Sequence, residues 1–377
     1  MRLFYRSNHP FAHWWHCIDH ITLAILFLIL AFSAAVSFSS SSAVASSFGV
    51  DSTYFARRQI MFLFGAIPVI LFLSFLSVQG VRNFAILLFL AALFAVALTL
   101  FNGTEIKGAQ RWIDVLGVRV QPSELLKPAF VVLTGWLMSA PTPEKRIKGF
   151  FASGFLLCLI AVLLMMQPDF GMFVLFSMIW FAQMFFANLS PVLLFGLVGF
   201  VLVMLSFGYI FLSHVRQRVM QFLDPSSGDS YQVDRAQQAF IDGGLFGRGP
   251  GEGVVKNMVP DAHTDFVFAV IAEEFGIISC LILIALYGAL MVRLFSKTVD
   301  AENRFITLAG GGLLFLFGMQ AMINMGVALN LLPTTGMTLP FVSYGGSSML
   351  GMAITMGFLF ALTRKKRDGH VQKNGKK

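Results

Sequence analysis

Residues 84–101 read FAILLFLAALFAVALTLF and contain no charged side chain. An α-helix needs about 20 predominantly apolar residues to cross the hydrocarbon core of a bilayer, so this run predicts a transmembrane helix. Comparable apolar runs recur along the chain on both sides of it. The repetition indicates an integral membrane protein with several spans.

The composition of the 377 residues agrees with this prediction. Hydrophobic residues make up 57% and charged residues 12%, and the mean hydropathy is +0.77. This leaves too little polar surface for two or three soluble domains. The net charge of +8 comes from basic residues scattered between apolar runs. Such a pattern indicates membrane topology and contact with anionic lipid, not nucleic-acid binding.

We therefore expect an all-α polytopic membrane protein with ten transmembrane helices. A large extracytoplasmic loop, residues 213–264, separates helices seven and eight. The predicted spans are residues 21–38, 60–76, 84–101, 124–137, 150–166, 171–186, 192–212, 277–292, 305–328 and 347–362. Residues 1–17 form a cytoplasmic segment, 18–363 the membrane domain and 364–377 a basic cytoplasmic tail. A cleaved signal peptide is the alternative for the N-terminus, but its apolar run is too long.

The orientation follows from the lysines and arginines, because basic residues near span ends are retained in the cytoplasm. The basic tail 364–377 and the short connections 145–148 and 293–304 then lie inside, and both termini are cytoplasmic. The serine run 39–42 becomes a polar outer loop. The other clusters of polar residues all fall at the outer side. The three cysteines are isolated in sequence, so neither a disulfide framework nor a zinc site is expected.

Charged residues beside apolar spans mark the first candidate site, since charges at membrane depth rarely persist without a partner or a task. Glu124 and Lys127 are three residues apart and share one face of a helix, for which Ser123 is the expected N-cap. They form an ion pair that anchors one helix to another, or Lys127 and Arg111 meet an anionic lipid head group. The sequence leaves both interpretations open.

Asp169 lies in the very short turn 167–171 between two spans, so its carboxylate stays close to the bilayer. It caps the following span, or it pairs with Lys127 or Arg111 across the bundle. These two interpretations are equally supported by the sequence.

The predicted outer loop 213–264 is far longer than the connections of compact bundles, which indicates a functional segment. Arg216 and Arg218 lie near its start and Gln237 in its middle. The glycine-rich run 243–251 lacks the lysine and the serine or threonine of a phosphate-binding loop and follows no strand. We interpret this run as a shaped loop without a nucleotide.

The loop ends in AHTDF, residues 262–266. Thr264 or Asp265 is an N-cap for the next helix, or Asp265 is a general base; the sequence supports the two equally. Beside Phe266 and Phe268 at the lipid boundary, the carboxylate would be desolvated and its pKa raised, which suits a base.

Residues 330–348 contain two prolines and three glycines between the last two spans, so we expect them to be non-helical. Irregular backbone at membrane depth is tolerated where it lines a cavity. An ordinary external turn is the alternative.

These motifs resemble the SEDS family, the polytopic membrane proteins of bacterial shape, elongation, division and sporulation. The resemblance covers nearly the whole membrane region, and 332–340 and 345–348 are closer to the division members than to the elongation members. Asp261 departs from the family, whose loop usually has Glu here. The resemblance is carried by Arg111-Trp112, 121–124 with Lys127, 167–171, the glycine-rich loop, 262–266 and 343–347.

The resemblance implies a peptidoglycan glycosyltransferase that polymerises lipid II at the outer face of the bacterial cytoplasmic membrane, at the division septum. The family's catalytic aspartate corresponds to Asp265. The expected substrate-binding residues are Arg111, Glu124, Lys127, Arg216, Arg218, Gln237, His263, Ser343 and Tyr344.

The partners expected from the resemblance are lipid II, nascent glycan on polyprenyl diphosphate, membrane lipid, a class B penicillin-binding protein and other membrane proteins of cell division. A divalent cation, Mg²⁺ or Mn²⁺, is the one cofactor considered. A lipid II flippase and a non-catalytic scaffold for the penicillin-binding protein are the alternative functions. The flippase is disfavoured because its charged path would run through both membrane halves.

Overall fold

The computed structural model describes residues 10–49, 51–106, 109–115, 117–187, 196, 199, 202–203, 206–223, 231–258 and 261–364. Its elements are α1 (Pro10–Cys17), α2 (His20–Phe48), α3 (Tyr54–Ser74), α4 (Val78–Asn102), β1 (Thr104–Ile106), β2 (Ala109–Val115), β3 (Val118–Val120), α5 (Pro122–Met138), α6 (Pro143–Met166), α7 (Phe170–Phe186), α9 (Ser213–Leu223), α10 (Tyr231–Gly243), the 3₁₀ helix η3 (Val255–Met258), α11 (Val267–Val299), α12 (Arg304–Ala328) and α13 (Gly346–Thr363).

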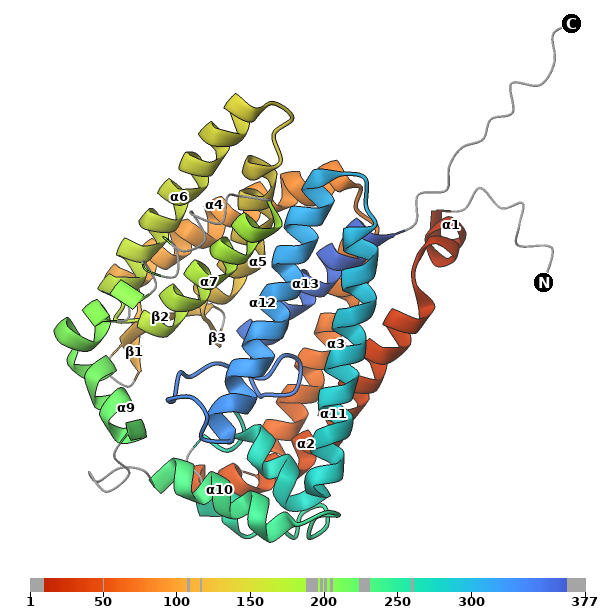
Figure 1. Cartoon of the computed structure of the whole chain (residues 1–377). Coiled ribbons are helices and arrows are strands. Elements are labelled where there is room, and N and C mark those ends of the chain that lie inside the picture. The colour runs from red at the N-terminus through yellow and green to blue at the C-terminus, as the bar shows by residue number, and fades with distance from the viewer. Residues whose placement is uncertain are drawn as a thin grey trace, which may run out of the picture.

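Long apolar helices form a bundle, as the sequence predicts (Figure 1). Within the described residues, seven helices are long and apolar enough to cross a membrane, namely α2, α3, α4, α6, α11, α12 and α13. α7 is apolar but shorter. The chain is therefore a multi-pass helical membrane protein, and the count of ten spans stays a prediction. Residues 192–195, 197–198, 200–201 and 204–205 of the predicted span 192–212 lie outside the described residues.

Helices α12 and α13 are the most buried spans and form the centre of the bundle. α13 packs against α3 and α5, and α12 packs against α5, α7 and α11. Glycines permit this close packing: a Cβ on Gly135 of α5 would lie 2.9 Å from the backbone nitrogen of Ala309, and one on Gly351 of α13 would lie 2.6 Å from the carbonyl of Glu124. Small residues let helices approach where lipid leaves little hydrophobic drive for association.

The two ends of the bundle differ in their polar contacts. At one end, which we call the terminal end, Trp14 of α1 donates to the Ser74 hydroxyl at 2.8 Å and Arg364 donates to the Ser74 carbonyl at 3.3 Å. Asp19, just before α2, pairs with Arg293 of α11 at this end. α9 and α10 lie at the opposite end, which we call the loop end (Figure 1).

The segment between α4 and α5 corrects the all-α prediction, because it contains a three-stranded antiparallel sheet in the order β1-β2-β3. Thr104 lies opposite Trp112, and Asp114 lies opposite Arg119. Strands β1 and β3 have only three residues each, too few for an alternating pattern to be detected in the sequence. The predicted loop 213–264 is also more ordered than expected, since it contains α9, α10 and η3.

The predicted outer loop at residues 39–42 is wrong, because α2 continues through it to Phe48. The hydroxyls of Ser37 and Ser41 bond to backbone groups within the bundle. Ser37 donates to the carbonyl of Ser33 at 2.7 Å, and Ser41 donates to that of Ser52 at 2.7 Å while accepting from the amide of Ala56. Serines that bond to backbone groups can remain helical inside a bundle.

α11 is broken at Gly276, whose backbone has φ 80° and ψ 170°. The break leaves carbonyls and amides of the helix without their usual partners. The glycine-rich loop supplies them: the amides of residues 248 and 249 donate to the carbonyls of residues 273 and 274 at 2.9 and 3.0 Å, and the carbonyl of Gly244 accepts from the amide of Ile277 at 3.0 Å. The shaped loop predicted from the sequence therefore supplies the hydrogen-bond partners that the helix break requires.

Glycine is required where this loop meets the break. A Cβ on Gly276 would collide with the carbonyl of Leu245, and one on Gly247 would collide with the carbonyl of Glu274. The φ and ψ of Gly276 also lie in a region open almost only to glycine.

We predict that Gly276→Ala lowers the thermal unfolding temperature of the detergent-purified protein, because the new methyl group pushes the loop away and strains the backbone by about 1–3 kcal/mol. Gly288→Ala is the matched control, since it lies in the same helix with no atom within 4 Å of an added Cβ. Equal unfolding temperatures for the two variants would contradict the prediction.

Candidate active site

Three successive backbone carbonyls fix the turn that carries Asp265. These are the carbonyls of residues 263–265. The amide of Tyr344 donates to the first at 2.8 Å, the hydroxyl of Ser343 to the second at 2.5 Å, and the side-chain amide of Asn324 to the third at 3.0 Å. α12 and the non-helical connection after it therefore position the Asp265 turn.

Asp265 does not occupy the N-cap position of α11. α11 has Phe266 at its N-cap position and no side-chain cap, and the hydroxyl of Thr264 instead donates to the carbonyl of Asp261 at 3.1 Å. The capping interpretation of Thr264 and Asp265 is thus wrong. Asp265 is half-buried, and its Oδ2 is the one described atom within 4.0 Å of a Cβ built on Gly336. Gly336 therefore leaves room beside the carboxylate.

Asp169 performs both roles that the sequence left open. It caps α7 by accepting from the amide of Met172 at 3.4 Å, and its Oδ2 lies 3.5 Å from Nε of Arg111. Arg111 also donates to the carbonyls of Gln167 and Pro168. Burial raises the pKa of Asp169, and the guanidinium of Arg111 opposes that rise. The ion pair joins β2 to the turn between α6 and α7.

Arg218 of α9 connects this ion pair to Asp265. Its guanidinium donates to the carbonyl of Thr334 at 3.3 Å. Its packed surroundings and the charge of Arg111 lower the pKa of Arg218, whereas Asp169 and Asp265 raise it. Residues from four separate segments thus share one electrostatic environment.

Glu124 and Lys127 form the ion pair that the sequence predicts, with 2.7 Å between Nζ and Oε2. Lys127 is fully buried and also donates to Oε1 of Gln320 at 2.8 Å. The side-chain amide of Gln320 in turn donates to the hydroxyls of Thr338 at 3.1 Å and Ser348 at 3.4 Å. The pair therefore ties α5 to α12 and α13, which supports the anchoring interpretation.

This anchored pair borders the site just described. The charges of Glu124 and Lys127 both act on Asp169. The expected N-cap Ser123 is wrong: Gln121 occupies that position and Pro122 begins the helix. Proline is favoured in the first turn because its missing N–H needs no partner there.

The other predicted binding residues are less central. Arg216 is exposed and donates to the carbonyls of Tyr209 and Ile210 at 3.2 and 2.5 Å. Gln237 is exposed on α10. The rings of His263 and Tyr344 are 5.4 Å apart. The amide of Tyr344, the carbonyl of His263 and the hydroxyl of the buried Ser343 take part in the hydrogen bonds that hold the Asp265 turn.

The sequence analysis does not identify two residues that position the site, Gln320 and Asn324. Both are 1% exposed, and Asn324 also donates to the carbonyl of Met337 at 2.7 Å. They lie four residues apart within the apolar run 305–328, so both project from one face of α12. Two amides on one face of an apolar span were the signal that could have revealed them.

The arrangement suits general-base chemistry next to an anion. A carboxylate held by its backbone can accept a proton, and arginines beside it stabilise negative charge on a leaving group. Among the described residues, no three His, Cys, Asp or Glu side chains converge to hold a metal ion.

Comparison with known proteins agrees with this chemistry. The FtsW/RodA/SpoVE family model, described as "Cell cycle protein", matches residues 19–368. A Caulobacter vibrioides protein named "Probable peptidoglycan glycosyltransferase FtsW" is 41% identical over 370 residues, covering 96% of this chain and 95% of that protein. A Geobacter metallireducens protein of the same name is 30% identical over 364 residues, covering 93% and 96%.

Solved structures share the fold. A chain from "Structural coordination of polymerization and crosslinking by a peptidoglycan synthase complex" has a TM-score of 0.76 and 28% identity, covering 92% of this chain and 97% of that chain. The rod shape determining protein RodA of Thermus thermophilus has a TM-score of 0.65 and 26% identity, covering 93% and 97%.

We predict that Lys127→Met lowers the unfolding temperature of the detergent-purified protein, because it leaves Glu124 buried without its ion pair at a cost of about 3–5 kcal/mol. The double variant Glu124→Leu with Lys127→Met should recover most of the loss, since it removes both charges. If Lys127→Met unfolded at the wild-type temperature, the anchoring interpretation would be wrong and a direct head-group contact would be favoured.

Proposed function

The chain belongs to the FtsW/RodA/SpoVE family of cell cycle proteins, and on this premise we propose that it polymerises lipid II into glycan for the septal wall. It is a peptidoglycan glycosyltransferase, as its relatives are named. The observation that carries the site assignment is the carboxylate of Asp265, whose turn is fixed by three hydrogen bonds and whose charge acts on Arg218. Lipid II as substrate and the septum as location are our proposal.

Asp265 acts as the general base in this mechanism. The acceptor is the 4-hydroxyl of an incoming lipid II, and the donor is the anomeric carbon of the growing glycan on polyprenyl diphosphate. The hydroxyl oxygen attacks the anomeric carbon, its proton passes to the carboxylate of Asp265, and the bond to the diphosphate breaks. One displacement inverts an α-linked donor to a β-1,4 bond and releases polyprenyl diphosphate.

Arg218 stabilises the departing diphosphate. Its guanidinium is exposed and, beyond the carbonyl of Thr334, is available to an anion at the loop end. Arg111 supports it but is already engaged by Asp169. Arg216 lies two residues before Arg218 on α9 and adds positive charge to this helix. A guanidinium close to developing negative charge lowers the barrier.

A divalent cation would be held by Asp265 together with the substrate. Mg²⁺ commonly binds one or two carboxylates together with substrate phosphates, so Asp265 and the diphosphate would supply its ligands. The ion would then neutralise charge on the leaving group. We propose Mg²⁺ or Mn²⁺ in that role only.

The two ends of the bundle are proposed to face opposite sides of the membrane. We propose that the loop end faces the outside of the cytoplasmic membrane and that the terminal end, with both chain termini, faces the cytoplasm. Arg293 and Lys297 of α11 pair with Asp19 at the terminal end, as the positive-inside rule favours. A class B penicillin-binding protein is the proposed partner, and the likeness to a chain of a peptidoglycan synthase complex supports it.

We predict that Asp265→Asn abolishes polymerisation, because an amide cannot accept the proton of the attacking hydroxyl. Loss of a general base costs about 10²–10⁴-fold in rate. The assay follows labelled lipid II into glycan on a gel, using protein reconstituted with its penicillin-binding partner.

Asp51→Asn is the matched control, since Asp51 is exposed and pairs with Arg57 at 3.3 Å. It should polymerise at the wild-type rate. Polymer formed by Asp265→Asn at the wild-type rate would refute the base. A scaffold, in contrast, would keep its function in both variants.

We predict that Arg218→Gln lowers the turnover number by about 10²–10³-fold, the usual effect of removing one donor to a developing charge. Arg119→Gln is the control, because Arg119 is exposed and pairs with Asp114 at 3.6 Å. Turnover numbers from initial rates of polymerisation test the prediction. An Arg218→Gln variant with a raised KM and unchanged turnover would assign Arg218 to substrate binding alone.

A further inference from the structure

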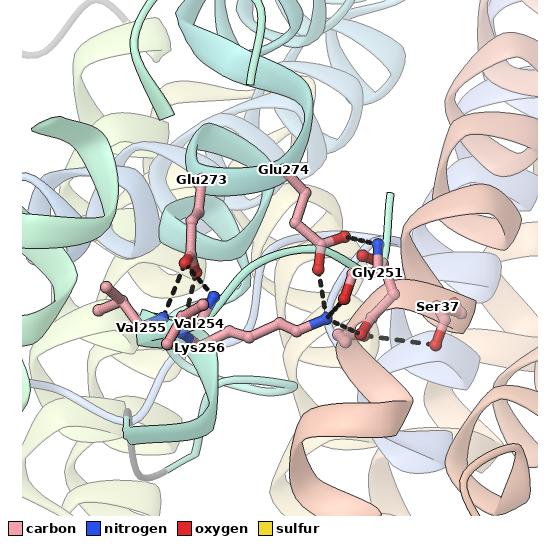
Figure 2. A network of polar contacts seen from close by, with 9 residues as sticks. Ser37, Gly251, Val254, Val255, Lys256, Glu273 and Glu274 are labelled. Atoms are coloured by element: carbon pink, nitrogen blue, oxygen red, sulfur yellow. Dashed lines mark hydrogen bonds and ion pairs between the residues drawn. The ribbon is translucent and has the colours of Figure 1, made fainter. Parts of the chain in front are cut away.

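Three buried charged side chains lie outside the site described above. Lys256 is 2% exposed, Glu273 is fully buried and Glu274 is 1% exposed. Figure 2 shows them between α11 and the segment 251–256, which leads into η3 and includes its first two residues. Buried charges are costly unless they are paired and hydrogen-bonded, so their contacts indicate what they hold in place.

Glu273 holds the segment through backbone amides alone. Its Oε1 accepts from the amides of Val254 and Val255 at 2.6 and 2.7 Å, and its Oε2 accepts from that of Lys256 at 2.8 Å. Three N–H donors stabilise a carboxylate without a cation. Glu273 therefore fixes the start of η3 to α11 (Figure 2).

Glu274 and Lys256 extend the same connection to α2. The ammonium of Lys256 forms an ion pair with Oε1 of Glu274 and donates to the carbonyls of Gly251 and Ser39, each at 3.3 Å. The other oxygen of Glu274 accepts from the amide of Gly251 at 3.0 Å. We call Lys256, Glu273 and Glu274 the latch; it joins α11, the loop and α2.

The latch lies at one end of the short helical segment 267–275, and Asp265 lies at the other. This segment is separated from the rest of α11 by the break at Gly276. At 1.5 Å per residue it is about 14 Å long, and polar contacts hold it at both ends. The carbonyl contacts of residues 263–265 hold one end, and the latch holds the other.

We infer that Lys256, Glu273 and Glu274 are positioning residues for Asp265, an inference that rests on the proposed function. None of them touches the reacting groups. They set the tilt of the segment 267–275 and so the position of the base against the acceptor hydroxyl. Apolar residues of similar size often stabilise a core as well as a buried ion pair does, so defined geometry is the reason to keep charges here.

The test compares the latch variants with wild type in proteoliposomes. Lys256→Met alone leaves Glu274 unpaired and should destabilise the protein. The double variant Lys256→Met with Glu274→Leu removes both charges and should recover the unfolding temperature. We expect this double variant to retain the KM for lipid II but to lose turnover on the order of 100-fold, because small misplacement of a catalytic group has effects of that size.

Hydrogen–deuterium exchange supplies a readout that a merely structural role would not move. In the double variant we expect faster exchange confined to the amides of residues 261–266, with the spans protected as in wild type. Arg248→Gln is the matched control: its ion pair with Asp242, at 3.0 Å, lies on the same loop but is partly exposed. If the double variant fails to fold, Lys256→Gln, which keeps a donor for Ser39, takes its place.

The possible outcomes are distinct. Wild-type turnover, or unchanged exchange at residues 261–266, in a stable latch variant would overturn the inference while leaving the polymerase intact. Wild-type protein that makes no glycan would instead overturn the proposed function. In that case the exchange data alone still decide whether the latch orders the Asp265 turn.

Discussion

The whole loop end depends on one constraint: inside a membrane, every backbone amide and carbonyl needs a partner within the protein. The chain departs from helix twice near the site, at Gly276 and between α12 and α13. At the first departure the glycine-rich loop supplies the missing donors and acceptors. At the second, Asn324 donates to the carbonyl of Met337 and the hydroxyl of Ser343 accepts from the amide of Leu339. The same two side chains also donate to the carbonyls of Asp265 and Thr264. The side chains that satisfy the irregular backbone are therefore the same ones that place the base.

Much of this could be predicted from the sequence, because lipid imposes strong patterns. Apolar runs gave the long spans, and the three-residue spacing of Glu124 and Lys127 gave their ion pair. The prolines and glycines of 330–348 predicted a non-helical connection, which the structure shows as far as Gly345, whereas 346–348 already belong to α13. The sequence also predicted Arg111 as one of two possible partners of Asp169, and these two residues form an ion pair.

The rest could not be predicted because it depends on partners distant in sequence. Whether Ser123 or Gln121 starts a helix depends on Pro122 and on the strand before it, which has too few residues to show a pattern. The serines at 39–42 look like a loop until their partners on neighbouring segments are known. Glu273 and Glu274 read as two charges in an apolar helix, and only the folded loop shows the amides that they bind.

The balance of charge explains why α9 matters for catalysis. The site contains as many cations as carboxylates, namely Arg111, Lys127 and Arg218 against Glu124, Asp169 and Asp265. Lys127 is committed to Glu124 inside the bundle, and Arg111 is committed to Asp169. The guanidinium of Arg218 bonds a neutral carbonyl, so it can turn to a diphosphate without breaking an ion pair. Because α9 carries Arg218, movement of α9 toward or away from Asp265 would govern how well the leaving group is stabilised.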